Sequence, residues 1–112
     1  MFFKKELRDK ILAGEKWETR RQWSRPMTKV GGIYQVRISR HKKGYHFLIL
    51  VLAMRKSKLG AMTSDDAIAE GFSSLDKFKE CWKKVNGTFD PDEEVTVIRF
   101  RVCSETEKME RQ

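Results

Sequence analysis

The 112-residue sequence predicts one α+β domain in which an antiparallel or mixed sheet, able to close into a small barrel, is flanked by helices. Helical and strand-like segments follow one another in the order helix, strands, two helices, strand, without the βαβ alternation of a parallel sheet. The length matches a single core of about 100–150 residues, and 39% apolar against 36% charged residues supply that core and a highly polar surface. We therefore expect one domain at 1–112, with a core at about 4–102 and a polar tail at 103–112.

A short amphipathic helix is predicted at residues 4–13. Its apolar residues fall on one side and are Leu7, Ile11 and Leu12. Gly14 suits the left-handed turn that ends such a helix. Residues 15–23 have no helical stripe and alternate as an extended segment does, and the Pro-containing residues 24–29 form a loop.

Two strands are predicted next. A β-type run at 33–38 follows the pair Gly31-Gly32, and the basic turn at 42–44 separates it from a strand at 45–55. The second of these strands is apolar on both alternating faces. We therefore expect it to be the most buried strand and to lie inside the sheet rather than at its edge.

Two helices with matching start signals are predicted in the second half. Thr63 and Asp66 form a capping box for a helix at 64–70, and Ser73 with Asp76 repeats the signal for a longer helix. The apolar stripe of the longer helix consists of Leu75, Phe78, Trp82 and Val85.

The C-terminal part predicts one more strand and a tail. Asn86-Gly87 ends the longer helix, and Asp90-Pro91-Asp92 forms a turn before a strand at 95–102. Residues 104–112 are charged and without pattern, so we expect them to be frayed.

The residue types that bind metals and cofactors are scarce. Two cysteines, Cys81 and Cys103, and two histidines, His41 and His46, are too few for a zinc site, a disulfide framework or a Ser-His-Asp triad. The sequence also contains no Walker-type loop, GxGxxG, HExxH or GxSxG motif. We therefore predict no metal and no cofactor, and we expect both cysteines to be reduced thiols in or near the core.

No membrane-spanning or secretory segment is expected. The longest apolar run, Phe47–Met54, has eight residues, whereas a membrane-spanning helix needs about 20. The first three residues are followed at once by Lys4, Lys5 and Glu6, which leaves no apolar stretch for a signal peptide. The expected location is cytoplasmic and the default oligomeric state is a monomer.

The net charge of +8 is unevenly distributed. Residues 1–60 carry 16 Lys and Arg against 4 Asp and Glu, a net +12, whereas residues 61–112 carry 8 against 12, a net −4. Clustered cations attract phosphates, so the first half predicts an anionic partner such as nucleic acid. The alternative is an ordinary, well-solvated basic surface.

The densest group of functional residue types lies at 14–25, where four cations, two indoles and two hydroxyls occur. Arg and Lys neutralise phosphates, and Trp stacks on bases with about 1–3 kcal/mol per base, a combination suited to single-stranded nucleic acid. The candidate ligand-binding residues are Lys16, Trp17, Arg20, Arg21, Trp23 and Arg25, with Tyr34 and Arg37 as weaker candidates. The competing interpretation is that the indoles pack in or beside the core and the arginines are solvated charges.

The same segment resembles a known family. Ile-Leu-Ala-Gly-Glu-Lys-Trp-Glu-Thr-Arg-Arg at 11–21 is similar to the GxKxx(E/T)xR signature of ASCH domains, which belong to the PUA-like superfamily of small β-barrels. Similar family features are Gly32-Ile33-Tyr34, Asp66–Phe72, Phe78, Trp82 and Val97–Phe100. The resemblance covers about residues 7–102 and implies a PUA-like barrel with helices beside a cleft, and a role in binding RNA or nucleotides.

Part of the stretch resembles one branch of that family, the bacterial N4-acetylcytidine amidohydrolases. The resemblance places their catalytic lysine, threonine and glutamate on Lys16, Thr19 and Glu70. Lys16, with a lowered pKa, would activate Thr19 or a water molecule, and Glu70 would donate a proton or hold the base edge. The chain departs from this branch in Arg20, in its two nearby tryptophans and in its longer Trp-containing helix. In a regular strand Lys16 and Thr19 would face opposite sides, so joint action requires an irregular segment.

Two functions therefore stay open from the sequence. The first is a binding module for RNA, a nucleotide or a nucleoside, and the alternative is an amidohydrolase acting through Lys16, Thr19 and Glu70. A nuclease ranks below both, because neither a carboxylate cluster nor a histidine pair is evident. A protein-interaction domain using Phe2, Phe3 and the last strand has general hydrophobicity in its favour.

Overall fold

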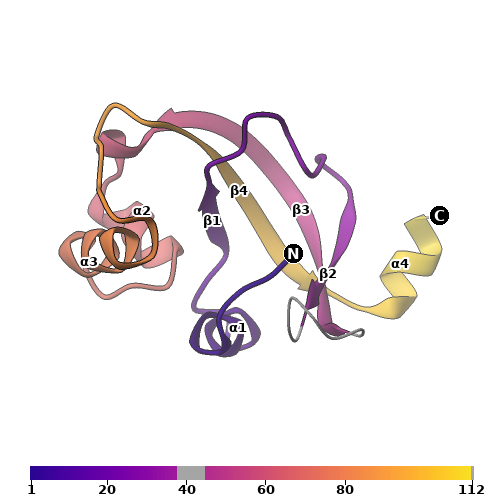
Figure 1. Ribbon diagram of the computed structural model, residues 1–112. Helices are drawn as coiled ribbons and strands as arrows, with labels where there is room; N and C mark the ends of the chain where they lie inside the picture. The colour runs from indigo at the N-terminus through magenta and orange to yellow at the C-terminus, as the bar shows by residue number, and fades with distance from the viewer. Residues whose placement is uncertain (38–44, 112) are drawn as a thin grey trace.

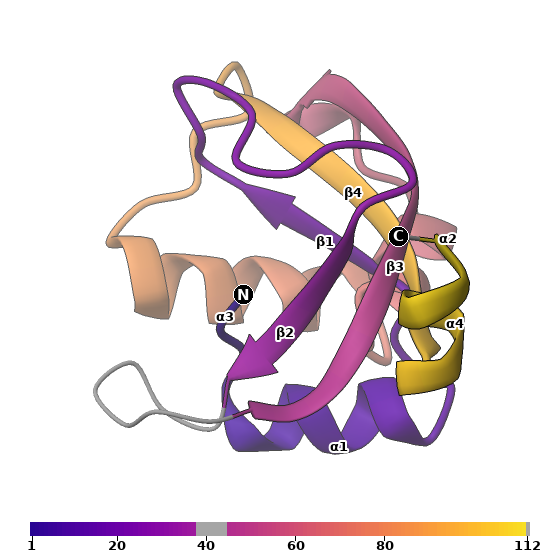
Figure 2. The same ribbon diagram turned by 90° about the vertical axis from the view of Figure 1, so that its right-hand side faces the viewer.

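A computed structural model describes residues 1–37 and 45–111, so the predicted basic turn at 42–44 lies outside the described residues. One antiparallel sheet with strand order β1-β4-β3-β2 forms the centre of the molecule (Figure 1). Its strands are β1 (Glu18–Arg21), β2 (Ile33–Arg37), β3 (Tyr45–Lys58) and β4 (Glu94–Cys103). The sheet curls into a half-barrel (Figure 2), which confirms the predicted α+β class.

The two long inner strands produce the curl. β3 and β4 pair from Leu48 opposite Cys103 to Lys58 opposite Glu94, with a shift of register between Val51 and Ala53. A bulge of this kind bends the strand and increases its twist. β3 lies inside the sheet as predicted and extends to Lys58. β1 and β2 form the two edges, so the chain between them crosses one end of the sheet (Figure 2).

Three of the helices pack around the sheet (Figure 1). α1 (Lys5–Leu12), α2 (Ser64–Ala69) and α3 (Leu75–Asn86) lie close to their predicted positions, and the 3-10 turn η1 (Leu59–Ala61) precedes α2. In Figure 1, α2 and α3 lie together at one end of the sheet and α1 lies below it. In the part of the chain that the structure describes, no helix has the length and apolarity that a membrane span requires.

β4 separates two hydrophobic clusters. Side chains alternate along a strand, so Val97 joins the cluster beneath α2 and α3, whereas Ile98 and Phe100 join the cluster beside α1. The first cluster also contains Phe78 and Trp82 of α3, as their stripe predicts. β4, like β3, is an interior strand of the sheet, and both of its faces carry buried residues.

The cysteines are placed as expected. Cys103 is buried and Cys81 is half-buried.

The prediction of a frayed tail at 104–112 was wrong. Residues Glu105–Arg111 form a further helix, α4, at the far end of the sheet from α2 (Figure 1). The Ser104 hydroxyl accepts a hydrogen bond from the Glu107 amide at 3.1 Å, and Arg101 donates to both Glu107 carboxylate oxygens at 3.0 and 2.7 Å. A serine cap and a bidentate ion pair are the contacts that stabilise a short terminal helix.

The capping box at α2 is confirmed, but the start of α3 lies one residue beyond the predicted cap. The Thr63 hydroxyl accepts from the Asp66 amide, and the Asp66 carboxylate accepts from the Thr63 amide. At α3 the cap is Ser74, whose hydroxyl accepts from the Lys77 amide at 3.2 Å. Ser73, favoured by the sequence pattern, precedes the cap.

We expect Ser74→Ala to lower the free energy of unfolding by about 1 kcal/mol, because it removes the acceptor for an otherwise unpaired helix amide. Ser73→Ala serves as the matched control and is expected to change it by less than about 0.5 kcal/mol. Urea unfolding followed by tryptophan fluorescence measures both. A larger loss for Ser73→Ala than for Ser74→Ala would contradict the assigned cap.

Candidate functional site

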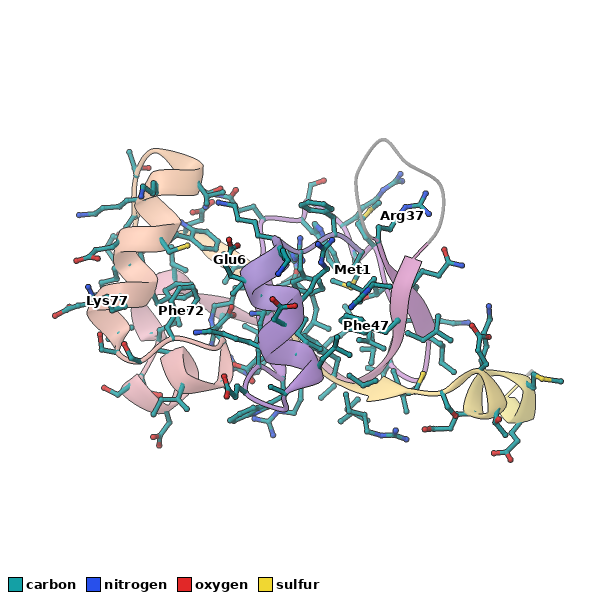
Figure 3. The ribbon with its side chains drawn as sticks, turned by 90° about the horizontal axis from the view of Figure 1, so that it is seen from below. Met1, Glu6, Arg37, Phe47, Phe72 and Lys77 are labelled. Atoms are coloured by element: carbon teal, nitrogen blue, oxygen red, sulfur yellow. The ribbon has the colours of Figure 1, made fainter. Side chains whose placement is uncertain are left out.

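A cavity of about 310 Å³ lies between the N-terminal segment, β1 and α3. Glu70 and Phe72, from the connection between α2 and α3, complete its wall, and Figure 3 shows Phe72 between α1 and α3. The lining residues are Phe2, Phe3, Lys4, Leu7, Lys16, Thr19, Arg20, Arg21, Gln22, Glu70, Phe72, Phe78, Cys81, Trp82, Val85 and Asn86. Such a volume stands at the small end of the range for ligand pockets, about 300–1,000 Å³.

Lys16 is the central polar residue of the cavity wall. Its side chain is 1% exposed, and its ammonium group donates to the Glu18 carbonyl at 2.8 Å, the Glu70 carbonyl at 2.9 Å and Glu70 Oε1 at 3.0 Å. These three acceptors match the three N–H donors of a lysine. The Lys16 ammonium is therefore fixed in one position.

The backbone that follows Lys16 is anchored at both polar groups of Trp17. The Trp17 amide donates to the Ala69 carbonyl at 2.9 Å, and the Trp17 carbonyl accepts from the Phe100 amide at 3.0 Å. Gly71 adopts a positive φ of 95°, and a Cβ there would lie 3.2 Å from Lys16 Cβ. Glycine at this position therefore permits both the turn after Glu70 and the close approach of Lys16.

A chain of buried ion pairs extends from Lys16 along β1. Arg20 Nη1 lies 3.0 Å from Glu18 Oε1 and 3.1 Å from Glu70 Oε2, and its side chain is 1% exposed. Arg20 also lies 3.6 Å from Asp66. The Glu70 carboxylate is thus held by Lys16 on one oxygen and by Arg20 on the other. Buried charges are tolerated when they are paired and hydrogen-bonded in this way.

Burial lowers the pKa of Lys16 below its ordinary value of 10.5. The Glu70 carboxylate opposes this shift, whereas the charges of Arg21 and Arg20 add to it. Desolvation disfavours the charged form of a lysine, so the direction follows from the enclosure of the ammonium. A lysine with a lowered pKa supplies a neutral amine more readily than a surface lysine does.

Folding stability is expected to increase with pH between the lowered folded-state pKa of Lys16 and 10.5, its unfolded value. In that range the unfolded chain binds a proton at Lys16 that the folded chain has released, which makes the slope of stability against pH positive. The increase should be absent in Lys16→Met and retained in Lys5→Met, whose lysine is 75% exposed. Denaturant unfolding at a series of pH values measures it, and parallel curves for wild type and Lys16→Met would contradict this assignment.

Part of the cavity lining is aromatic. Phe72 and Phe78 meet edge-on with ring centroids 5.4 Å apart, and Phe78 lies 5.8 Å from Trp82. The Arg21 guanidinium lies over the Phe3 ring, with Arg21 Cζ 4.7 Å from the ring centroid. The Trp82 indole nitrogen is buried, and among the described residues it has no hydrogen-bond partner. The cavity therefore combines flat apolar surfaces with a fixed set of charges.

Lys16, Thr19 and Glu70, the residues to which the family resemblance assigns chemistry, all line this cavity. Lys16 precedes β1, which begins at Glu18, so the alternation that would separate it from Thr19 does not apply. Thr19 is buried on β1 opposite Ile98. Their proximity is a structural fact, and their catalytic role stays a prediction.

The predicted ligand-binding residues divide into two groups. Lys16, Arg20 and Arg21 line the cavity. Trp17, Trp23 and Arg25 are not lining residues of the cavity. Trp17 is 38% exposed and Arg25 is exposed, whereas Trp23 is half-buried against the core cluster beside α1. Arg20 differs from expectation in that it binds three carboxylates.

The weaker candidates Tyr34 and Arg37 also lie away from the cavity. The Tyr34 hydroxyl accepts from the Lys29 amide at 2.8 Å.

Glu18 and the role of Phe3 in the core were not predicted from the sequence. Glu18 and Arg20 are two residues apart, the spacing that places two side chains on one face of a strand, and this signal marks an ion pair. Phe3 is 3% exposed and packs against Phe100 at 5.8 Å. Of the interaction surface predicted from Phe2, Phe3 and the last strand, Phe3 is buried and β4 is an inner strand, whereas Phe2 is half-buried.

Known structures share this fold. The ASCH domain from Lactobacillus crispatus JV V101 is similar with a TM-score of 0.72 and 23% identity, over 87% of this chain and 70% of that one. A protein from Enterococcus faecalis V583 is similar with a TM-score of 0.67 and 21% identity, over 94% of this chain and 72% of that one. The S128A mutant of an ASCH protein from Zymomonas mobilis is similar with a TM-score of 0.64 and 18% identity, over 90% of this chain and 65% of that one. The ASCH structures have a PUA-like fold, as the resemblance implies.

No curated protein matches the sequence. The ASCH domain family model, in contrast, matches residues 1–104. Because this match spans nearly all of the sequence and the fold agrees, the chain belongs to the ASCH domain family.

Proposed function

We propose that this chain binds RNA or a nucleotide by holding one base in the cavity between β1 and α3. The observation that carries the proposal is the composition of the lining, which combines Phe72, Phe78 and Trp82 with the buried charges of Lys16 and Glu70. Aromatic faces stack on bases, and a few fixed polar groups bind a base edge. The association of ASCH domains with RNA binding agrees with it.

The phosphate next to the base is assigned to cations at the cavity wall. Lys4 is exposed there, and Arg21 is half-buried. Trp17, Trp23 and Arg25 lie beyond the cavity and are candidates for contacts with a longer strand. A volume of about 310 Å³ suits one base-bearing unit rather than several stacked bases.

Binding is tested by placing a negative charge at the cavity. Val85 lines the cavity and is 57% exposed, so Val85→Glu is expected to weaken the affinity for single-stranded RNA about tenfold, or about 1.4 kcal/mol, by repulsion of phosphate. Val30→Glu is the matched control, because Val30 is 59% exposed and outside the cavity. Fluorescence anisotropy at about 50 mM salt measures both. Equal affinities of the two variants, or no wild-type affinity at this salt, would contradict the proposal.

A second candidate function is deacylation of N4-acetylcytidine or a similar nucleoside. The specific observation in its favour is that Lys16, Thr19 and Glu70 line one cavity, with Lys16 and Glu70 in contact at 3.0 Å. The lowered pKa of Lys16 adds to this, because a neutral amine is needed to accept a proton.

The proposed chemistry uses one proton carrier. The neutral Lys16 amine takes the Thr19 hydroxyl proton while Thr19 Oγ1 bonds to the acetyl carbonyl carbon, and the C–N bond to N4 breaks as Lys16 returns the proton to the leaving amine. Water then attacks the acetyl-threonine and gives one proton to Lys16, which returns it to Thr19 Oγ1 as the ester bond breaks and acetic acid leaves, to ionise to acetate in solution. Glu70, held by two cations, orients Lys16 and accepts a hydrogen bond from the base.

A further inference from the structure

A second hollow, of about 270 Å³, lies on the face of the sheet toward α2. Strand register explains its composition, because Arg99 of β4 lies opposite both Glu18 of β1 and Ala53 of β3, and Arg55 lies opposite Val97. Residues paired in this way project from the same face of a sheet. The buried Glu18 forms the floor, and the half-exposed arginines form the rim.

Positive charge exceeds negative charge around this hollow. The Glu18 carboxylate contacts three guanidinium groups, with Arg20 at 3.0 Å, Arg99 at 3.4 Å and Arg55 at 3.9 Å. Asp66, at 3.8 Å from Arg55, is the other acidic neighbour. Glu70 is already matched by Lys16. Three guanidinium groups therefore face two carboxylates, which leaves one positive charge for an added anion.

The arginines also keep most of their hydrogen-bonding capacity. A guanidinium carries five N–H donors. Arg99 donates one long hydrogen bond, of 3.4 Å, to Glu18. The distances from Arg55 to Glu18 and Asp66, 3.9 and 3.8 Å, exceed hydrogen-bonding range, and among the described residues Arg55 has no other ion pair. The Glu18 carboxylate thus holds the Arg55 and Arg99 guanidinium groups near each other, while most of their N–H donors have no acceptor among the described residues.

We propose that Arg55 and Arg99 form a phosphate-binding site. Two guanidinium groups that share one floor are suited to bridge a single phosphate, since each offers paired N–H donors to oxygens. The site rests on the proposed function in that the phosphate belongs to an RNA strand whose base occupies the cavity. A phosphate of a free nucleotide or inorganic phosphate has the same chemistry, and the experiment separates these sources.

The ion-pair chain connects the new site with the cavity. Glu18 lines the hollow, its neighbours Thr19 and Arg20 line the cavity, and Arg20 bridges Glu18 and Glu70. The two sites are therefore connected by the Glu18–Arg20 ion pair, whose members are two residues apart along β1.

The first test is a titration of the ¹⁵N-labelled protein with inorganic phosphate in chloride buffer, observed at the arginine Nε–H signals. The signals of Arg55 and Arg99 are expected to shift saturably, whereas the signal of Arg101, which is bonded to both Glu107 oxygens, is expected to stay. No shift, or equal shifts at all three arginines, overturns the site.

The second test identifies the source of the phosphate. Arg55→Gln/Arg99→Gln is expected to weaken single-stranded RNA binding about tenfold, and to reduce the slope of log affinity against log salt by about 0.7, the value of one phosphate contact. Lys56→Gln is the control, because Lys56 is 53% exposed, adjacent to Arg55 and on the opposite face. The buried Glu18 carboxylate keeps its ion pair with Arg20 at 3.0 Å in the double variant, so the double variant should fold.

The outcomes separate this site from the proposed function. Phosphate-induced shifts with loss of RNA affinity support the strand as the source, and shifts without that loss support free phosphate. If Val85→Glu has no effect on RNA, the cavity proposal fails while the phosphate titration still decides the arginine site. If the double variant binds RNA like wild type and phosphate moves no signal, the site is overturned while the cavity proposal stands.

Discussion

Replacing Glu70 by alanine is expected to lower the free energy of unfolding by about 3–5 kcal/mol, because it leaves two buried cations without a shared counter-ion. Lys16 would keep its two carbonyl acceptors but lose its only contacting carboxylate within the described residues. Arg20 would keep Glu18 and Asp66. Urea unfolding measures the change, and a loss below about 1 kcal/mol would contradict the expected cost of leaving these cations without Glu70.

Two further variants identify the cause of that loss. Glu80→Ala on α3 removes a carboxylate that is 71% exposed, and it should change stability by less than about 0.5 kcal/mol. Lys16→Met/Glu70→Leu removes both members of the pair and should be more stable than Glu70→Ala alone, because no lysine is left buried without a partner. If the double variant is the less stable one, packing rather than charge explains the effect.

Lys16→Met is expected to reduce turnover of N4-acetylcytidine by roughly 10²–10⁴-fold, the usual contribution of a general base. The physical reason is that Thr19 and Glu70 would keep their places while the proton acceptor is lost. Release of acetate and cytidine by the purified protein measures the rate. No turnover by wild type, or turnover that Lys16→Met leaves unchanged, would contradict the amidohydrolase candidate.

Matched variants separate chemistry from folding in that assay. Lys10→Met is the control for Lys16, because Lys10 donates to the Gly71 carbonyl and is not a lining residue of the cavity. Thr19→Val should abolish turnover, whereas Thr28→Val should not, because Thr28 is also buried but contacts Met54 away from the cavity. Equal rates for the two threonine variants would contradict a role of Thr19.

The elements that could be predicted from the sequence are those determined by local contacts. The capping box of Thr63 and Asp66 is formed by residues three apart, and the helix that it starts lies where expected. α4 was missed because part of its stability comes from Arg101, a residue of the preceding strand that binds Glu107. Because Arg101 lies outside residues 104–112, the sequence of that segment alone does not predict the helix.

The residues of the candidate site also divide into those that the sequence could predict and those that depend on the fold. Lys16, Thr19 and Glu70 could be identified from the family resemblance, but their partners depend on strand pairing and on the packing of α2 against β1. Glu18 and Arg20 look like two more charges in a basic segment until the fold buries both. The stripe of Phe78 and Trp82 predicts an apolar helix face but does not reveal that part of this face lines a cavity.

The central claim is that the cavity between β1 and α3 receives one base-bearing unit. It is tested most directly by the indole N–H signals of Trp82 and Trp17 in ¹H–¹⁵N spectra during titration with cytidine 5′-monophosphate. Trp82 lines the cavity and Trp17 does not, so the Trp82 signal is expected to shift saturably while the Trp17 signal stays in place. A Trp82 signal that does not move, or one that moves no more than that of Trp17, would contradict the claim.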